Sequence, residues 1–134
     1  MTCPSGSSLA LTECCGPIIA GSPAPSAEAM MRARYTAYTQ HNIDFIMAST
    51  HPDGRADSDI DAMRAWAETA DWQSLEVLQV EAGTNQDRKG LVEFKAHYLI
   101  GGVKHHHHEV SGFVNSDAGW QFRDGEVLHA GRGQ

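Results

Sequence analysis

The stretch that decides the fold reads Met31-Arg32-Ala33-Arg34-Tyr35-Thr36-Ala37-Tyr38. Met31, Tyr35 and Tyr38 recur at the spacing that places side chains on one face of an α-helix. An apolar and aromatic face of this kind must lie on another apolar surface. The segments between residues 72 and 124 are the one large apolar surface left in the sequence, so we expect helices laid across a sheet.

Three helices are expected, over residues 27–40, from residue 43 to about His51, and from residue 58 or 59 to about 69. Ser26 and Asn42 precede the first two helices, and their side-chain oxygens can accept a free backbone N–H of the first turn. Pro52 ends the second helix, because the residue before a proline is pushed out of helical space.

From Trp72 onward the apolar period changes to two, which is typical of strands. Four strands are expected near residues 72–80, 92–98, 106–115 and 120–124, joined by short turns. In the first of them Leu78 and Val80 fall out of phase with Leu75 and Val77, which indicates a bulge or burial on both faces. The sequence therefore predicts an α+β domain, with helices on one face of an antiparallel sheet of about four strands.

Composition narrows the class of protein. A chain of 134 residues fits one core. A formal net charge of −7, without a basic stripe, argues against binding to nucleic acid. No apolar run approaches the roughly 20 residues of a membrane helix, so we expect no membrane partner. The first residues lack the positive start and apolar stretch of a secretory signal, so we place the protein in the cytoplasm.

Residues 1–25 differ from the rest of the chain. They are rich in Ser, Gly and Pro and have too little apolar content to fold alone. We call them the arm, and we expect residues 26–134 to form the domain. All the cysteines, Cys3, Cys14 and Cys15, lie in the arm. A reducing cytoplasm disfavours disulfides, and clustered thiols there more often bind a metal.

Several motifs, in this order and spacing, resemble the YchJ family of small bacterial proteins over nearly the whole chain. They are Cys3-Pro4-Ser5-Gly6-Ser7, Cys14-Cys15-Gly16-Pro17, the helical stretch quoted above, His51-Pro52, Val92-Glu93-Phe94, Glu109-x-Ser111-x-Phe113 and Trp120-x-Phe122-x-Asp124-Gly125. The resemblance implies an N-terminal SEC-C zinc motif attached to a cone-shaped domain of the nuclear transport factor 2-like fold. It implies no particular biochemical activity.

The resemblance implies that Cys3, Cys14 and Cys15 bind Zn²⁺ as thiolates. However, the SEC-C motif normally has cysteine where this chain has Ser5, and a neutral hydroxyl is a poor zinc ligand. The fourth position would then be filled by water, by a histidine from elsewhere, or not at all. The alternative is a loose or locally packed segment with three free thiols. A second departure is Gly112, where the family usually carries arginine.

The run His105 to His108 precedes the Glu109 motif. On a strand, alternate side chains point to opposite faces, so at most two of these histidines share a face. A weak metal site is one interpretation, and a solvated strand end near a hairpin is the other.

A ligand pocket is predicted between the sheet and the helices. Glu109, Ser111 and Phe113 share one strand face, and Asp124 shares a face with Trp120 and Phe122 on the next strand. If both faces turn inward, Glu109 and Asp124 would lie near the residues Arg34, Tyr35 and His51. A carboxylate beside a histidine in such a cavity performs acid and base chemistry. The alternative is a buried ion pair, with arginine neutralising the carboxylate.

Two functional hypotheses follow. The first is a binding or adaptor module for a small ligand or a protein partner. The second is a small enzyme of the isomerase or hydrolase type that uses Asp124 or Glu109 with His51. A dry cavity around an unpaired carboxylate of raised pKa favours the enzyme, whereas a carboxylate bridged to arginine favours the module. Self-association through the exposed sheet face, giving a homodimer, is a third expectation.

Overall fold

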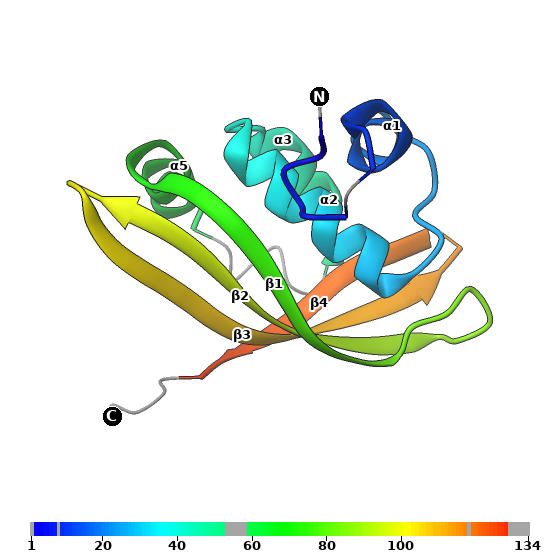
Figure 1. The fold of residues 1–134 in the computed structure, drawn as a ribbon. Helices are drawn as coiled ribbons and strands as arrows, with labels where there is room; N and C mark the ends of the chain where they lie inside the picture. The colour runs from blue at the N-terminus through cyan, green and yellow to red at the C-terminus, as the bar shows by residue number, and fades with distance from the viewer. Residues whose placement is uncertain (1, 8, 53–58, 118, 129–134) are drawn as a thin grey trace.

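The computed structural model describes residues 2–7, 9–52, 59–117 and 119–128. A curved antiparallel sheet forms one layer, and the helices lie on its concave face (Figure 1). Its strands pair in chain order. They are β1 (Asp71–Ala82), β2 (Lys89–Ile100), β3 (Val103–Ser116) and β4 (Gly119–Val127). The predicted α+β architecture with a four-stranded meander is confirmed.

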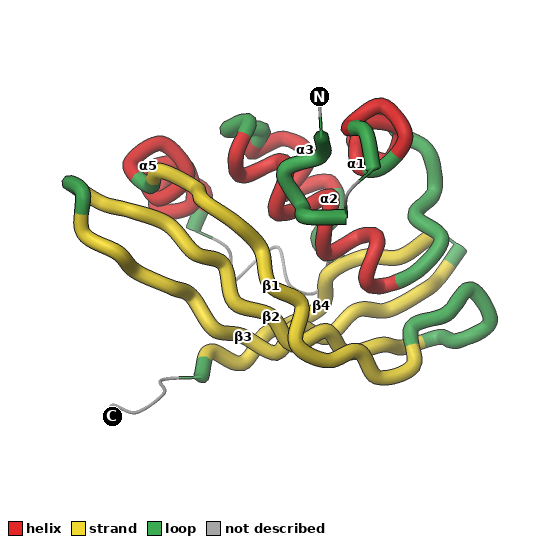
Figure 2. Tube along the Cα trace, viewed as in Figure 1, coloured by secondary structure: helices red, strands yellow, loops and turns green. Residues whose placement is uncertain are grey.

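The helical layer contains α2 (Ala27–Thr39), α3 (Ile43–Ala48) and α5 (Ile60–Thr69) (Figure 2). The caps predicted for the first two helices are present. Ser26 Oγ accepts the Ala29 N–H at 3.1 Å, and Asn42 Oδ1 accepts the Phe45 N–H at 3.0 Å. Asp59 caps α5 in the same way, whereas Ser58, the other predicted start, lies outside the described residues. No helix of the described residues is long and apolar enough to cross a membrane.

The second helix is shorter than predicted, because it ends at Ala48 and not near His51. Thr50 forms a parallel bridge with Phe122 of β4, and the His51 backbone N–H donates to the Phe122 carbonyl at 2.7 Å. The chain therefore leaves the helix before Pro52 in order to pair with the sheet.

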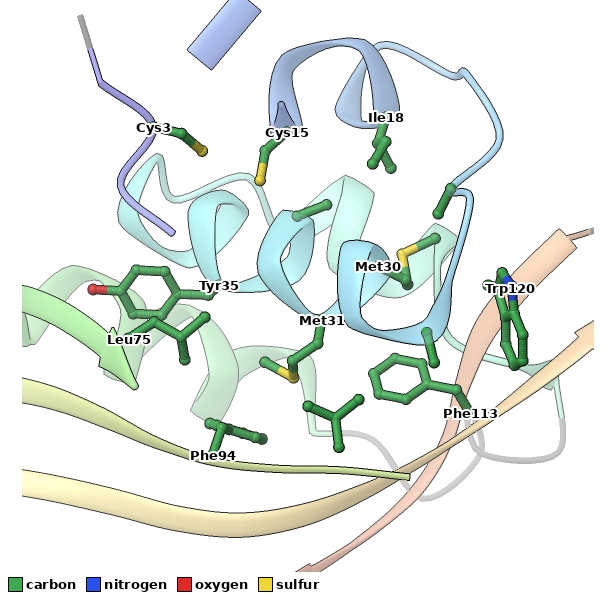
Figure 3. Close-up of a cluster of buried hydrophobic side chains, with 14 of the residues drawn as sticks. Cys3, Cys15, Ile18, Met30, Met31, Tyr35, Leu75, Phe94, Phe113 and Trp120 are labelled. Atoms are coloured by element: carbon green, nitrogen blue, oxygen red, sulfur yellow. The ribbon is translucent and has the colours of Figure 1, made fainter. Parts of the chain in front are cut away.

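The predicted apolar face of α2 lies on the sheet. Met31 and Tyr35 are 6% and 3% exposed, and Figure 3 shows them between α2 and the strand residues Leu75 and Phe94. Tyr38 is half-buried at the other end of the same face, against Trp66 and Trp72. The aromatic side of this helix therefore closes over the sheet as the sequence predicts.

The arm contains a 3-10 turn (Leu11–Glu13) and the short helix α1 (Cys15–Ile19). Cys3, Cys15 and Ile18 belong to the same apolar cluster as Met30 and Met31 of α2 (Figure 3). The described part of the arm thus packs on α2, which supplies the apolar surface that the arm lacks. The division into residues 1–25 and 26–134 stays a prediction.

The sheet is irregular at three places. The predicted bulge in β1 is confirmed, with register shifts between Trp72 and Ser74 and between Val77 and Gln79. The third shift lies in the β3–β4 pair, between Gly112 and Phe113. In addition, β3 begins at Val103 and not at residue 106, because Gly101 and Gly102, with φ of +57° and +80°, make a two-residue turn.

Candidate functional site

The thiols of Cys3, Cys14 and Cys15 form a cluster, which we call the thiol cluster, with the three sulfur atoms within 4.8 Å of one another. Cys3 lies on the extended start of the chain, where its N–H donates to the Leu9 carbonyl at 2.8 Å. Cys14 precedes α1, and Cys15 is the first residue of that helix. A turn and a short helix thus bring distant thiols together.

The hydroxyl of Ser5 lies among these sulfurs. Ser5 is fully buried, with Oγ 3.2 Å from Cys3 Sγ and 3.7 Å from Cys14 Sγ. The sulfurs of Cys14 and Cys15 are 3.7 Å apart. Tetrahedral zinc with Zn–S bonds of about 2.3 Å separates two sulfurs by roughly 3.8 Å. The spacing of the Cys14 and Cys15 sulfurs therefore fits a tetrahedral cation, and the Cys3 sulfur lies within 4.8 Å of both.

The thiols of the cluster differ in acidity. Burial raises the pKa of Cys3, but hydrogen bonds from Ser5 and Thr36 outweigh burial and lower this pKa to about 6. Burial raises the pKa of Cys15 to about 12. Of these two thiols, Cys3 is therefore the one that is ionised at neutral pH. Because a cation binds thiolates, its binding would release the remaining protons.

Helix α2 contacts the thiol cluster and Ser5 through Thr36 and Arg32. Arg32 Nη1 donates to the Ser5 carbonyl at 2.5 Å, and Arg32 Nε donates to Glu28 at 2.9 Å. One turn later, Thr36 Oγ1 lies 3.7 Å from Cys3 Sγ. The bond from Arg32 thus joins the Ser5 segment of the arm to α2.

A second site is a cavity of about 160 Å³ between α2, α5 and the concave face of the sheet, which we call the cleft. Its walls are mostly aromatic. The centroids of Trp66 and Trp72 are 5.1 Å apart, and those of Tyr38 and Trp66 are 5.4 Å apart. The aromatic residues that line it are Tyr35, Tyr38, Trp66, Trp72, Phe94 and Phe122.

Glu109 of β3 lies in this cleft as part of a hydrogen-bonded group. His107 Nε2 is 2.7 Å from Glu109 Oε1, and Ser111 Oγ donates to Glu109 Oε2 at 2.6 Å. Burial raises the pKa of Glu109, but the bonds to His107 and Ser111 outweigh burial and lower it. The carboxylate lies against Gly125 of β4, at the position that a Cβ would occupy. Glu109 is therefore ionised at neutral pH.

Arg34 is the buried cation of the cleft. Its Nη1 donates to the Ile46 carbonyl at 2.9 Å, Ser49 Oγ at 2.8 Å and Thr50 Oγ1 at 3.1 Å. Its guanidinium carbon lies 4.6 Å from the centre of the Phe122 ring. Burial lowers the pKa of Arg34 to about 10, so the group stays charged. Neutral oxygens accept the hydrogen bonds of Arg34, and Arg34 and Glu109 interact electrostatically without a direct hydrogen bond between them.

Arg34, Tyr35 and Glu109 are brought together as predicted, but Asp124 is not. The bulge pairs Gly112 with Asp124 and Phe113 with Phe122, so Arg123 is the extra residue. One extra residue turns the following side chain to the other face of the sheet. The carboxylate of Asp124 is exposed, 2.5 Å from where a Gly112 Cβ would lie. Its predicted place in the pocket is therefore wrong.

His51 is also misplaced by the prediction. Thr50 lines the cleft, whereas His51 is not among the described residues that do so. His107, for which a solvated strand end was one of two interpretations, lies beside the carboxylate of Glu109, where the sequence predicts His51. Its side chain is 22% exposed. The alternation of β3 contains the signal, because His107 lies two residues before Glu109 on the same face.

Comparison with known proteins identifies the family of this chain. The family model described as the middle, nuclear transport factor 2-like domain of YchJ matches residues 26–125. This chain belongs to the YchJ family. The fold of this family member is therefore the nuclear transport factor 2-like fold that the resemblance implies.

Relatives of this YchJ family member cover both the arm and the domain. The UPF0225 protein GSU1048 of Geobacter sulfurreducens is 44% identical over 92% of this chain and 77% of its own length. The SEC-C motif protein RPA3114 of Rhodopseudomonas palustris is 38% identical, with a TM-score of 0.86 over 96% of this chain and 99% of the relative. A SEC-C motif protein of Psychrobacter arcticus is 33% identical, with a TM-score of 0.79 over 96% and 83%.

Proposed function

We propose that the protein is a binding module whose arm is fixed to the domain by one zinc ion, bound by the thiolates of Cys3, Cys14 and Cys15. The observation that carries this proposal is the spacing of the donor atoms, since the Cys14 and Cys15 sulfurs are 3.7 Å apart. The fourth ligand is an oxygen, from Ser5 or from a water molecule that Ser5 orients.

The surroundings of the thiol cluster support this assignment. Ser5 Oγ lies 3.2 Å from Cys3 Sγ, and Arg32 of α2 donates to the Ser5 carbonyl, so the segment that carries the donor atoms is joined to the domain. Zn²⁺ in such sites supplies folding free energy, because the unfolded chain holds no preformed site. The ion would therefore fasten the described part of the arm onto α2, and its role is structural.

Metal analysis tests the proposal. We expect about one equivalent of zinc per chain in protein purified without chelators, and loss of this equivalent in Cys15→Ser. Co²⁺ in place of zinc should give the absorption of a thiolate-bound tetrahedral ion, and Ser5→Cys should intensify the sulfur-to-metal band.

The histidine run requires a control. His106→Ala, on the outer face of the sheet, removes incidental metal binding there and should leave the cobalt spectrum unchanged. A spectrum without thiolate bands, or a zinc content that Cys15→Ser does not change, would contradict the proposal.

A second candidate function is catalysis in the cleft, with His107 as the base and in place of His51. If the Nε2–H of His107 donates to Glu109 Oε1, the Nδ1 lone pair remains available to take a proton. Ser111 bonds to Glu109 and not to His107, so the arrangement does not activate this serine as a nucleophile. The lowered pKa of Glu109 favours binding over acid catalysis.

Proton exchange separates the two functions. An enzyme of this type should accelerate the exchange of an acidic C–H of small carbonyl compounds in D₂O, and His107→Gln should remove the acceleration. Equal exchange with the wild type and the variant would leave the binding module as the function.

A further inference from the structure

The size of the cleft limits what it can bind. At about 160 Å³ it is close to the roughly 150 Å³ of an apolar cavity that holds one benzene molecule. It is smaller than the roughly 300 Å³ at which pockets for drug-sized ligands begin. A single ring with one or two substituent atoms fits this volume.

The charges in the cleft limit the charge of its ligand. Among the described residues that line it, Arg34 supplies a positive charge, and Glu109, which is bonded to His107, supplies a negative charge. Both side chains are largely buried, so a ligand that enters loses most of its hydration. A charged ligand would give up that hydration without gaining a net opposite charge, which is costly. A neutral ligand avoids this penalty.

The hydrogen bonds of Glu109 leave room for one more donor. Its two oxygens can accept about four hydrogen bonds, and the described partners, His107 and Ser111, use two. A hydroxyl group on the ligand is a neutral donor for the remaining capacity. The ring that carries the hydroxyl can extend the edge-to-face contacts of Tyr38, Trp66 and Trp72.

We propose that the cleft binds a neutral molecule with a single aromatic ring and a hydroxyl group that donates to Glu109. This inference names the ligand class of the cleft and does not depend on zinc in the arm or on catalysis. Binding alone is therefore the property to measure.

Four small probes of the same ring size test the proposal on the full-length, metal-loaded protein: phenol, anisole, benzoate and benzylammonium. Phenol should bind at least about tenfold more tightly than either charged probe, a difference of about 1.4 kcal/mol. Anisole, which lacks the hydroxyl proton, should bind more weakly than phenol.

The tryptophans of the chain report where a probe binds. It has three tryptophans, and the indole N–H signals of Trp66 and Trp72 in NMR spectra report on the cleft. Trp120 lines a separate pocket next to α3 and serves as the internal reference. Phenol should shift the Trp66 and Trp72 signals and leave the Trp120 signal in place. A shift at Trp120 alone, no shift, or tighter binding of a charged probe would overturn the proposal.

A charge variant provides an independent check. Glu109→Gln keeps the shape of the side chain and leaves the positive charge of Arg34 uncompensated. The preference of the cleft should then change from phenol to benzoate. If this variant does not fold, the four-probe comparison with the wild type still decides the question. A folded Glu109→Gln that prefers benzylammonium would contradict the assignment of charges.

Discussion

At the scale of single residues, Glu109 shows how neighbours determine a protonation state. Burial alone would favour the neutral acid, yet His107 and Ser111 donate to both oxygens and lower the pKa. A group whose folded-state pKa is lowered stabilises the protein above its ordinary pKa of 4.5. That stabilisation declines as the pH falls through the folded value.

The first prediction concerns the acid stability of the cleft. At neutral pH the wild type should have a larger free energy of unfolding than Glu109→Gln. This difference in free energy, the gap, should narrow as the pH falls below 4.5. Urea unfolding of both proteins over this range measures the gap. Arg34 and His107 line the cleft with Glu109, and both are present in the two proteins that are compared. A gap that is constant with pH would mean that the carboxylate is not ionised in the fold.

At the scale of elements, α3 is the part that positions Arg34. The helix is only six residues long, and its carbonyl of Ile46 together with Ser49 and Thr50 binds the guanidinium. A helix of this length is not stable by itself, so its cap and its contacts must maintain it. Asn42 is that cap.

The second prediction follows from this cap. Asn42→Ala should lower the free energy of unfolding by about 1 kcal/mol, because the Phe45 N–H loses its acceptor. Asp44→Asn is the matched control in the same first turn and should cost only about 0.3 kcal/mol through the helix dipole. Equal effects of the two changes in thermal or urea unfolding would show that Asn42 does not act as a cap.

The elements also show what the sequence can and cannot predict. Helix positions followed from period and caps, and Ser26 and Asn42 both cap as predicted. The bulge at Gly112 was not visible, because two strand partners and not one local pattern determine it. That single extra residue explains why Asp124 is exposed and does not lie in the predicted pocket. The sequence does not place His107 in the cleft, because no local pattern shows that Trp66 of α5 covers this end of β3.

At the scale of the whole molecule, the arm and the domain share one apolar core. Ile18 of α1 is 8% exposed and belongs to the cluster that contains Met30, Phe113 and Trp120. A shared core predicts that the arm unfolds together with the domain in one transition. Self-association through the exposed face of the sheet stays a prediction that light scattering can test.

The third prediction uses two residues of the arm. Ile18→Ala should cost about 2–5 kcal/mol, the range for truncation of a core side chain of this kind to alanine. Leu9→Ala, at a position that is 52% exposed, should cost less than about 0.5 kcal/mol. Circular dichroism and tryptophan fluorescence should report the same unfolding curve for each protein. A loss of the arm before the domain would show two separate units.

The chain-order pairing of the strands also has a kinetic consequence. Each of the three strand pairs joins neighbours along the chain, so little loop entropy is lost when a hairpin closes. Contacts of this local kind are typical of fast folding. The bridge between Thr50 and Phe122 instead joins segments from opposite ends of the domain. The hairpins should thus assemble early during refolding, and closure of the helical layer onto β4 should set the overall rate.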